Sequence, residues 1–167
     1  TYPCDAPDKP GNEIVFGDGF PTPNGHAKLV AVGLVPPAEQ PDEQYPMVLT
    51  TGRQLEHWHT GAMTRRASVL DTIEPEAVAF MSPKDMRRLK LSPGDFIRLK
   101  TRRGAVEVKL RADRDVPENM VFMPFCYAEA AANLLTNPSL DPFGKIPEFK
   151  FCAASVEAVA MMRTAAE

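Results

Sequence analysis

Short apolar and alternating segments recur along the chain after residue 46 and predict a mainly β protein. Six strands are expected, at residues 47–51, 77–81, 97–101, 106–111, 120–125 and 152–159. The third and fourth alternate apolar with charged residues about a turn at Arg103 and Gly104, which is typical of a hairpin with one solvated face. The pattern places these residues in the core: Val48, Val78, Ile97, Leu99, Val106, Val108 and Val121.

Two short helices are predicted between the strands. Ser82, Pro83 and Asp85 combine a hydroxyl cap, a proline at the first helical position and an early acid, so a helix is expected from there to about Lys90. Residues 128–135 are mostly strong helix formers. Short strands with small helices between them favour a β-barrel or β-sandwich over a doubly wound sheet, and the pattern leaves barrel and sandwich both open.

The first 45 residues differ in amino-acid composition from the rest of the chain. Nine of the 17 prolines fall in the first 46 positions, which predicts an irregular, extended arm. One strand is expected within it, at residues 27–35, after the turn-forming residues 23–25. We therefore predict an arm over residues 1–45 and one domain over residues 46–167.

Charge and composition exclude several classes of function. A net charge of -3 and a pI near 5.7 give no global positive field for nucleic acid. The sequence has no long apolar run that predicts a membrane span and no amino-terminal signal pattern. Cys4, Cys126 and Cys152 are far apart, which favours neither a disulfide framework nor a zinc or iron–sulfur site. We expect a reducing compartment, the cytoplasm.

The segment from Thr50 to Gly61 has the densest set of polar groups and directly follows a predicted strand. Its glycines let a ligand approach the backbone, Arg53 suits phosphate, and Trp58 offers a stacking face. An ordinary surface turn with a core tryptophan is the alternative. His57 and His59 suggest a metal, but no third ligand follows at suitable spacing.

Several segments resemble the final domain of formate dehydrogenase and periplasmic-type nitrate reductase catalytic subunits, in the dimethyl sulfoxide reductase superfamily. The resemblance is carried by TGRQLEHWHTGAMTRR, SPKDMRRLKLSPGD, TRRGAVEV, VFMPF, EAAANLLTN and LDPFGKIPEFKFCAASVEAV. It implies a six-stranded double-psi β-barrel that binds molybdopterin guanine dinucleotide with molybdenum or tungsten. It also implies that the metal ligand, the iron–sulfur cysteines and all catalytic groups belong to earlier domains, so that this chain alone is inactive.

By the same resemblance, a set of residues converges on one face of the barrel to contact the cofactor. The set is Thr51, Gly52, Arg53, Gln54, Leu55, Glu56, His57, Trp58, His59, Thr60, Phe125, Asn133 and Lys150. Taken without the resemblance, Asn133 and Lys150 would be unremarkable surface residues. Relatives of the formate type usually have histidine where this chain has Cys126, which leaves the contact at that position open.

The resemblance implies the remaining domains of a formate-oxidising catalytic subunit as partners, together with electron-transfer subunits. Two other functions stay open. The equivalent domain of a nitrate reductase shares the TGRxxEHWHTG pattern, but EAAANLLTN and KIPEFK favour the formate branch. A non-catalytic double-psi barrel interaction module has no reason to combine Arg53, His57, Asn133 and Lys150.

Overall fold

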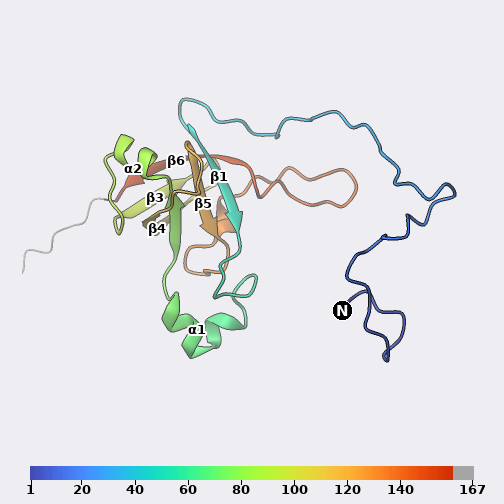
Figure 1. Cartoon of the computed structure of the whole chain (residues 1–167). Coiled ribbons are helices and arrows are strands. Elements are labelled where there is room, and N and C mark those ends of the chain that lie inside the picture. The colour runs from blue at the N-terminus through green and yellow to red at the C-terminus, as the bar shows by residue number, and fades with distance from the viewer. Residues whose placement is uncertain (160–167) are drawn as a thin grey trace, which may run out of the picture. The chain divides into compact units, whose positions relative to one another are not determined.

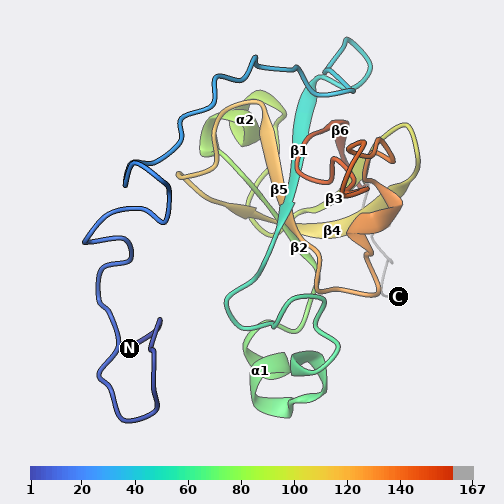
Figure 2. The ribbon, with the colours of Figure 1, turned by 90° about the vertical axis from the view of Figure 1, so that its right-hand side faces the viewer.

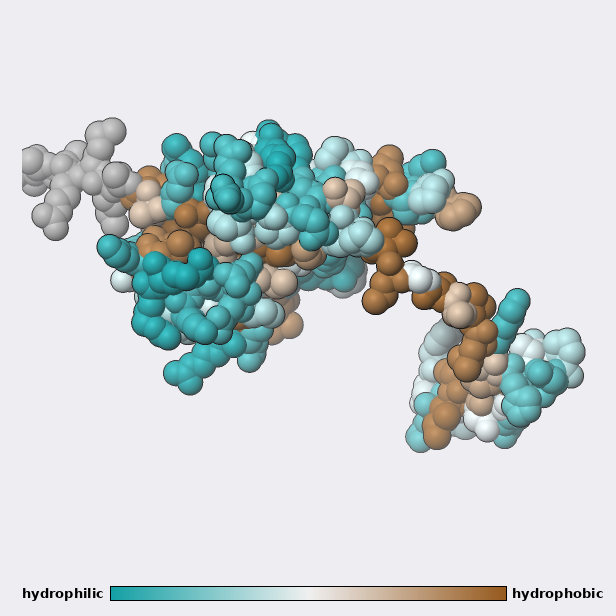
Figure 3. All heavy atoms as spheres, turned by 90° about the horizontal axis from the view of Figure 1, so that it is seen from above, coloured by the Kyte–Doolittle hydropathy of each residue, from teal (hydrophilic) through white to brown (hydrophobic). Residues whose placement is uncertain are grey.

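The computed structural model describes residues 1–159, which form two compact units, Thr1–Val35 and the chain from Pro36 onward (Figure 1). The first unit has neither helix nor strand over residues 1–35, as its prolines and glycines predict. The strand expected at residues 27–35 is wrong. β-prone residues make a strand only when another strand pairs with them, and here Leu29 and Leu34 are 94% and 101% exposed. Figure 3 shows hydrophobic residues at the surface of this segment.

Within the described residues of the second unit, six strands close into a barrel in the order β1-β5-β2-β4-β3-β6 (Figure 2). This confirms the predicted double-psi barrel class. The strands β1 and β5 are parallel, as are β2 and β4, and the other neighbours are antiparallel. Their bounds are β1 Met47–Gly52, β2 Val78–Met81, β3 Phe96–Lys100, β4 Ala105–Ala112, β5 Met120–Pro124 and β6 Cys152–Ala158.

The helices are short. The predicted helix after Ser82 is confirmed as α2, Pro83–Arg88, and Ser82 Oγ accepts a hydrogen bond from Asp85 N at 3.1 Å. Lys90 has a φ of 57°, a left-handed conformation that cannot continue a helix. Two other elements, η1 Thr64–Arg66 and α1 Ser68–Ile73, had no predicted counterpart.

The helix predicted at residues 128–135 is wrong. Only a single 3-10 turn, η2 Ala132–Leu134, forms there. Ala131 before it is extended, with a ψ of 112°, so the chain cannot start a helix earlier. Ala130 and Leu135 are 1% and 0% exposed, so packing against the core decides this conformation over the helix propensity of alanine.

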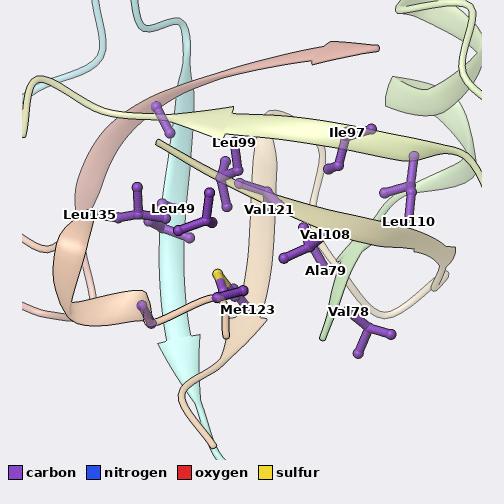
Figure 4. Close-up of a cluster of buried hydrophobic side chains, with 14 of the residues drawn as sticks. Leu49, Val78, Ala79, Ile97, Leu99, Val108, Leu110, Val121, Met123 and Leu135 are labelled. Carbon is purple, nitrogen blue, oxygen red and sulfur yellow. The ribbon is translucent and has the colours of Figure 1, made fainter. Parts of the chain in front are cut away.

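The core fills the barrel and confirms most of the predicted positions (Figure 4). Val78, Ile97, Leu99, Val106, Val108 and Val121 are all buried, as expected. The prediction that Val48 lies in the core was wrong. Val48 is only half-buried, while its neighbours Met47 and Leu49 are 1% and 0% exposed. Successive side chains of a strand point to opposite faces, so burying Leu49, which pairs with Val121 of β5, turns Val48 outward.

Candidate functional site

A pocket of about 310 Å³ lies where four chain segments meet at one edge of the barrel, and we call it the donor pocket. Because β1 and β5 are parallel neighbours, the residues that follow them leave the barrel at the same edge. Phe125 N donates to Gly52 O at 3.1 Å, which ties the two exits together. The lining residues are Arg53, His59, Thr60, Phe125, Asn133, Phe149 and Lys150.

Lys150 reaches the pocket from the segment just before β6. Its Nζ donates to Thr51 O at 2.6 Å, and the Thr51 hydroxyl donates to Phe149 O at 2.8 Å. These two bonds join residues nearly a hundred positions apart. An ammonium has three N–H donors, so Lys150 retains donors beyond the bond to Thr51.

The chemistry of the donor pocket suits an anionic ligand that carries aromatic rings. Among residues 1–159, its lining includes two basic side chains, Arg53 and Lys150, but no carboxylate. Asn133 and Thr60 add an amide and a hydroxyl, and the Phe125 and Phe149 rings add apolar faces. The donor set and the rings fit a dinucleotide, whose phosphates accept hydrogen bonds and whose ring systems stack.

His57 belongs to the same loop, but its imidazole is turned into the protein and is 1% exposed. Its Nε2 lies 2.7 Å from Glu74 O, and because a carbonyl oxygen only accepts, Nε2 carries the proton. Its Nδ1 lies 3.3 Å from Thr64 Oγ1, which accepts from Trp58 N at 2.9 Å. The Tyr127 ring packs against the imidazole with centroids 5.8 Å apart. Both ring nitrogens are therefore satisfied by the protein itself.

Ion pairs surround this histidine and hold the segment that connects β1 and β2. Arg65 pairs with Asp71 at 2.6 Å and Glu129 at 3.0 Å, with its guanidinium carbon 4.8 Å from the Tyr127 ring centroid. Arg111 on β4 pairs with Glu74 at 2.7 Å. We call the residues around the imidazole the His57 cluster, namely His57, Thr64, Arg65, Glu74, Arg111 and Tyr127.

A second depression, of about 510 Å³, shares Arg53 and His59 with the donor pocket. Trp58 helps to line it and is 65% exposed, so the tryptophan is not a core residue. Leu55, also in its lining, is 96% exposed. The exposed rim of the loop therefore presents a large aromatic and a large aliphatic side chain to solvent.

The profile of one protein family, the molydopterin dinucleotide binding domain, matches residues 47–153, which span the barrel from β1 into β6. The chain belongs to this family. Its matched region contains the donor pocket, the His57 cluster and most of the barrel. The description of the family agrees with the ligand class that the pocket chemistry suits.

Relatives of this molydopterin dinucleotide binding domain include subunits of formate dehydrogenases. It is 40% identical over 158 residues to the F420-dependent formate dehydrogenase 1 subunit alpha of Methanococcus maripaludis, covering 95% of this chain and 23% of the relative. It is 41% identical over 158 residues to the F420-dependent formate dehydrogenase subunit alpha of Methanocaldococcus jannaschii, covering 95% and 24%. The chain thus spans about a quarter of the length of these curated relatives.

Among solved structures, the domain resembles part of acetylene hydratase from Pelobacter acetylenicus. The TM-score is 0.64 at 21% identity, and the match covers 70% of this chain and 19% of that one. At this identity the match supports the fold alone. It agrees with the closed barrel described above.

The structure divides the thirteen residues predicted to contact the cofactor. It gathers six of them in the donor pocket: Arg53, His59, Thr60, Phe125, Asn133 and Lys150. Gln54, Leu55, Glu56, His57 and Trp58 contribute to the second depression. Thr51 and Gly52 are buried at the end of β1, where a Cβ on Gly52 would lie 2.4 Å from the Phe122 ring. Phe149 was missed, although its position next to Lys150 in EFKF was a usable signal.

Cys126 lies outside the donor pocket. It is buried and lines a depression of about 250 Å³ with Thr60, Gly61 and Arg65 among others. Burial raises the pKa of its thiol from 9.0 to about 11, so the group is protonated at neutral pH. The chain folds tightly around it, since a Cβ on Gly61 would lie 2.6 Å from Cys126 O.

Residues 1–159 include neither a candidate metal site nor a candidate membrane-spanning helix. No cluster of three or more histidine, cysteine or acidic side chains is suited to hold a metal ion there. Nor does this part of the chain include a helix with the length and apolar character needed to cross a membrane.

Proposed function

We propose that the donor pocket binds the guanine form of molybdopterin dinucleotide, through the residues predicted from the sequence. The observation that supports this most is the convergence of Arg53, Asn133 and Lys150 in one pocket, although they come from three separate segments. A volume of about 310 Å³ is at the lower end for small-molecule sites. The pocket therefore takes one part of the long dinucleotide, and the rest lies against the loop rim and other domains.

In this proposal, charge-assisted hydrogen bonds contribute most of the free energy of binding. Arg53 and Lys150 face the pyrophosphate and nearby polar atoms, and each charge-assisted hydrogen bond contributes about 1.5–3 kcal/mol. The ion pairs found among residues 1–159 do not include Arg53, so its guanidinium is available to the ligand. Asn133 presents an amide to a ring edge, while Phe125 and Phe149 exclude water beside it.

The domain acts within a larger catalytic subunit that oxidises formate to carbon dioxide, a proton and two electrons. The relatives that carry the name formate dehydrogenase support this activity. When bound, the cofactor carries the molybdenum or tungsten at which formate is oxidised. The residues of this chain hold and orient the cofactor and take part in no proton or electron transfer.

The proposal extends to organisation and location. Residues 1–45 lead into a cofactor-binding domain over residues 46–167, of which residues 160–167 lie outside the described part of the chain. The remaining domains of the subunit cover the pocket. Electron-transfer subunits are further partners, and the enzyme works in the cytoplasm. The names of the two relatives favour formate over nitrate as the substrate, and the family match favours cofactor binding over a pure interaction module.

The test compares two pocket variants with two matched surface variants in the holoenzyme. We expect Lys150→Ala and Arg53→Ala each to lower pterin content per subunit about tenfold at limiting cofactor, because each removes a charge that faces the ligand. Turnover per bound pterin stays at the wild-type value. The controls Lys100→Ala and Arg87→Ala remove exposed cations away from the pocket and keep full content.

Pterin content is measured by the fluorescence of the oxidised, released cofactor. Full content in both pocket variants would contradict the proposed site. Full content with lost turnover would instead give these residues a part in the reaction.

A further inference from the structure

Two of the pocket segments lack regular structure over most of their length, so contacts other than strand pairing must hold them. Asn133 belongs to the short η2 turn, and Lys150 lies in the stretch between η2 and β6. Neither segment is part of the barrel ladder. Besides the bonds to Thr51 and the core packing of Leu135, contacts from Ala38 and Glu39, in the stretch before β1, reach both segments.

One path leads from Glu39 to the η2 turn. The Glu39 carboxylate forms a two-pronged ion pair with the guanidinium of Arg103, in the β3–β4 turn. The same guanidinium donates from Nε and NH2 to Leu135 O, at 3.1 and 2.8 Å. Leu135 directly follows η2 and is fully buried. A fork held at both ends is rigid, so Glu39 adds to the core packing of Leu135 in fixing where η2, and with it Asn133, lies.

A second path leads to the segment that carries Lys150. Ala38 N donates to the Glu148 carboxylate at 3.0 and 3.2 Å, and the same carboxylate accepts from Asn137 Nδ2 at 3.1 Å. Glu39 Oε1 accepts from Ala153 N in β6 at 2.7 Å. Lys150 lies between Glu148 and Ala153, so Ala38 and Glu39 hold the chain on both sides of it.

The surroundings of Glu39 make this contact strong. Its side chain is only 12% exposed, and Arg102 adds a second cation at 3.0 Å. Burial alone would raise the pKa of the Glu39 carboxyl, but the hydrogen bonds from Arg103 and Ala153 and the charges of Arg103 and Arg102 outweigh it and hold the pKa below 4.5. The carboxylate is therefore charged at neutral pH, and removing its charge would leave Arg103 without its partner.

We infer that Ala38, Glu39, Arg103 and Glu148 form a brace that positions Asn133 and Lys150 for the cofactor. This inference rests on the proposed function, because Asn133 and Lys150 matter only if they contact the dinucleotide. Glu39 is a positioning residue, since it does not line the donor pocket itself. The brace connects residues that come before the barrel with two pocket segments that come more than ninety positions later.

The test uses Glu39→Gln in the holoenzyme, with Glu107→Gln as its matched control. Glu107 also pairs with an arginine, Arg98 at 2.7 Å, but both side chains are about half exposed and neither lines the donor pocket. We expect Glu39→Gln to shorten the half-time of pterin loss about tenfold, while Glu107→Gln leaves it unchanged. Arg103→Lys keeps the charge but not the two-pronged geometry of the guanidinium. If Glu39→Gln does not yield folded protein, the half-time of pterin loss is measured in Arg103→Lys instead, with the same expected result.

Combining Glu39→Gln with Lys150→Ala separates positioning from a general loss of stability. If Glu39 acts through Lys150, the double variant loses pterin more slowly than the product of the two single effects predicts. A purely multiplicative effect of Glu39→Gln with both Lys150→Ala and Asn133→Ala, or equal loss in Glu39→Gln and Glu107→Gln, would overturn the brace. If Lys150→Ala alone leaves pterin loss unchanged, Lys150 does not hold the cofactor, and the brace is overturned while Arg53→Ala still tests the proposed function.

Discussion

The loop after β1 contributes residues to two neighbouring regions, one buried in the protein and the other exposed to solvent. In the His57 cluster, the imidazole is 1% exposed, and both nitrogens are within hydrogen-bonding distance of protein atoms. In the donor pocket, Arg53 and His59 are exposed and directed at a cavity. Residues only two positions apart, His57 and His59, therefore do different work, one holding the loop and the other lining the pocket.

This difference shows that a sequence signature can combine structural and ligand-facing residues. The turn between the two regions depends on backbone conformation, since His59 has a φ of 54° and Gly61 a φ of 75°. Left-handed residues reverse the direction of the chain, and here they place Trp58 and His59 outside while His57 stays inside. We expect the two regions to respond differently to substitution.

The largest effect should come from comparing the two histidines. His57→Ala leaves a cavity, removes the acceptor of the Thr64 hydroxyl proton and leaves Glu74 O with only the 3.4 Å hydrogen bond from Tyr127. We therefore expect the free energy of unfolding to fall by about 3 kcal/mol. His59→Ala should change it by less than about 0.5 kcal/mol, because the ring is exposed. Urea unfolding of the chain, followed by tryptophan fluorescence, measures both. Equal losses in the two variants would remove the distinction between the regions.

A smaller effect is expected in the donor pocket at Asn133. This residue is exposed on η2 and lines the pocket, so Asn133→Ala should leave the free energy of unfolding unchanged and lower pterin content about fivefold, as loss of one hydrogen bond predicts. The control is Gln44→Ala, which removes another exposed amide outside the lining of the donor pocket. Pterin content and urea unfolding are measured on the same preparations. Reduced content in the control would show that the loss is unrelated to the pocket.

The smallest effect concerns Cys126, which follows β5 and packs against Gly61 of the loop, at alkaline pH. Burial raises the pKa of Cys126 to about 11 from 9.0, and burial also raises that of Tyr127. A raised pKa means that the folded state keeps protons that the unfolded chain releases, so the stabilisation is full below pH 9 and declines as the pH rises toward 11. We expect the Cys126 thiol to account for about 1 kcal/mol of the loss between pH 9 and 10.

Unfolding of the wild type and Cys126→Ala at pH 8, 9 and 10 checks this expectation. The variant should lose less stability over that range than the wild type, whatever the two values are at pH 8. Parallel pH profiles would mean that the Cys126 thiol is not held in its protonated form by the fold.

The strands were predictable because alternation and turn residues report burial directly, as in the β3–β4 hairpin. The closure into a barrel came from the family resemblance, since pairing between distant strands leaves no local pattern. The failures have local causes: residues 27–35 lack a pairing strand, and residues 128–135 give up a helix for core packing.

The donor pocket was predictable only in part. Arg53 and the glycines indicated a ligand from the sequence, whereas Asn133 and Lys150 gained a role only by resemblance. The brace at Glu39 had no sequence signal, because a glutamate in a proline-rich stretch looks like a solvated residue until Arg103 and Ala153 are placed beside it.

An experimental density map of the holoenzyme would show directly whether the donor pocket holds the cofactor. We expect dinucleotide density in the donor pocket, with acceptor atoms within hydrogen-bonding distance of Arg53, Asn133 and Lys150 and with His57 still bonded to Glu74 O. Dinucleotide density that leaves all three of these pocket residues without contact would contradict it.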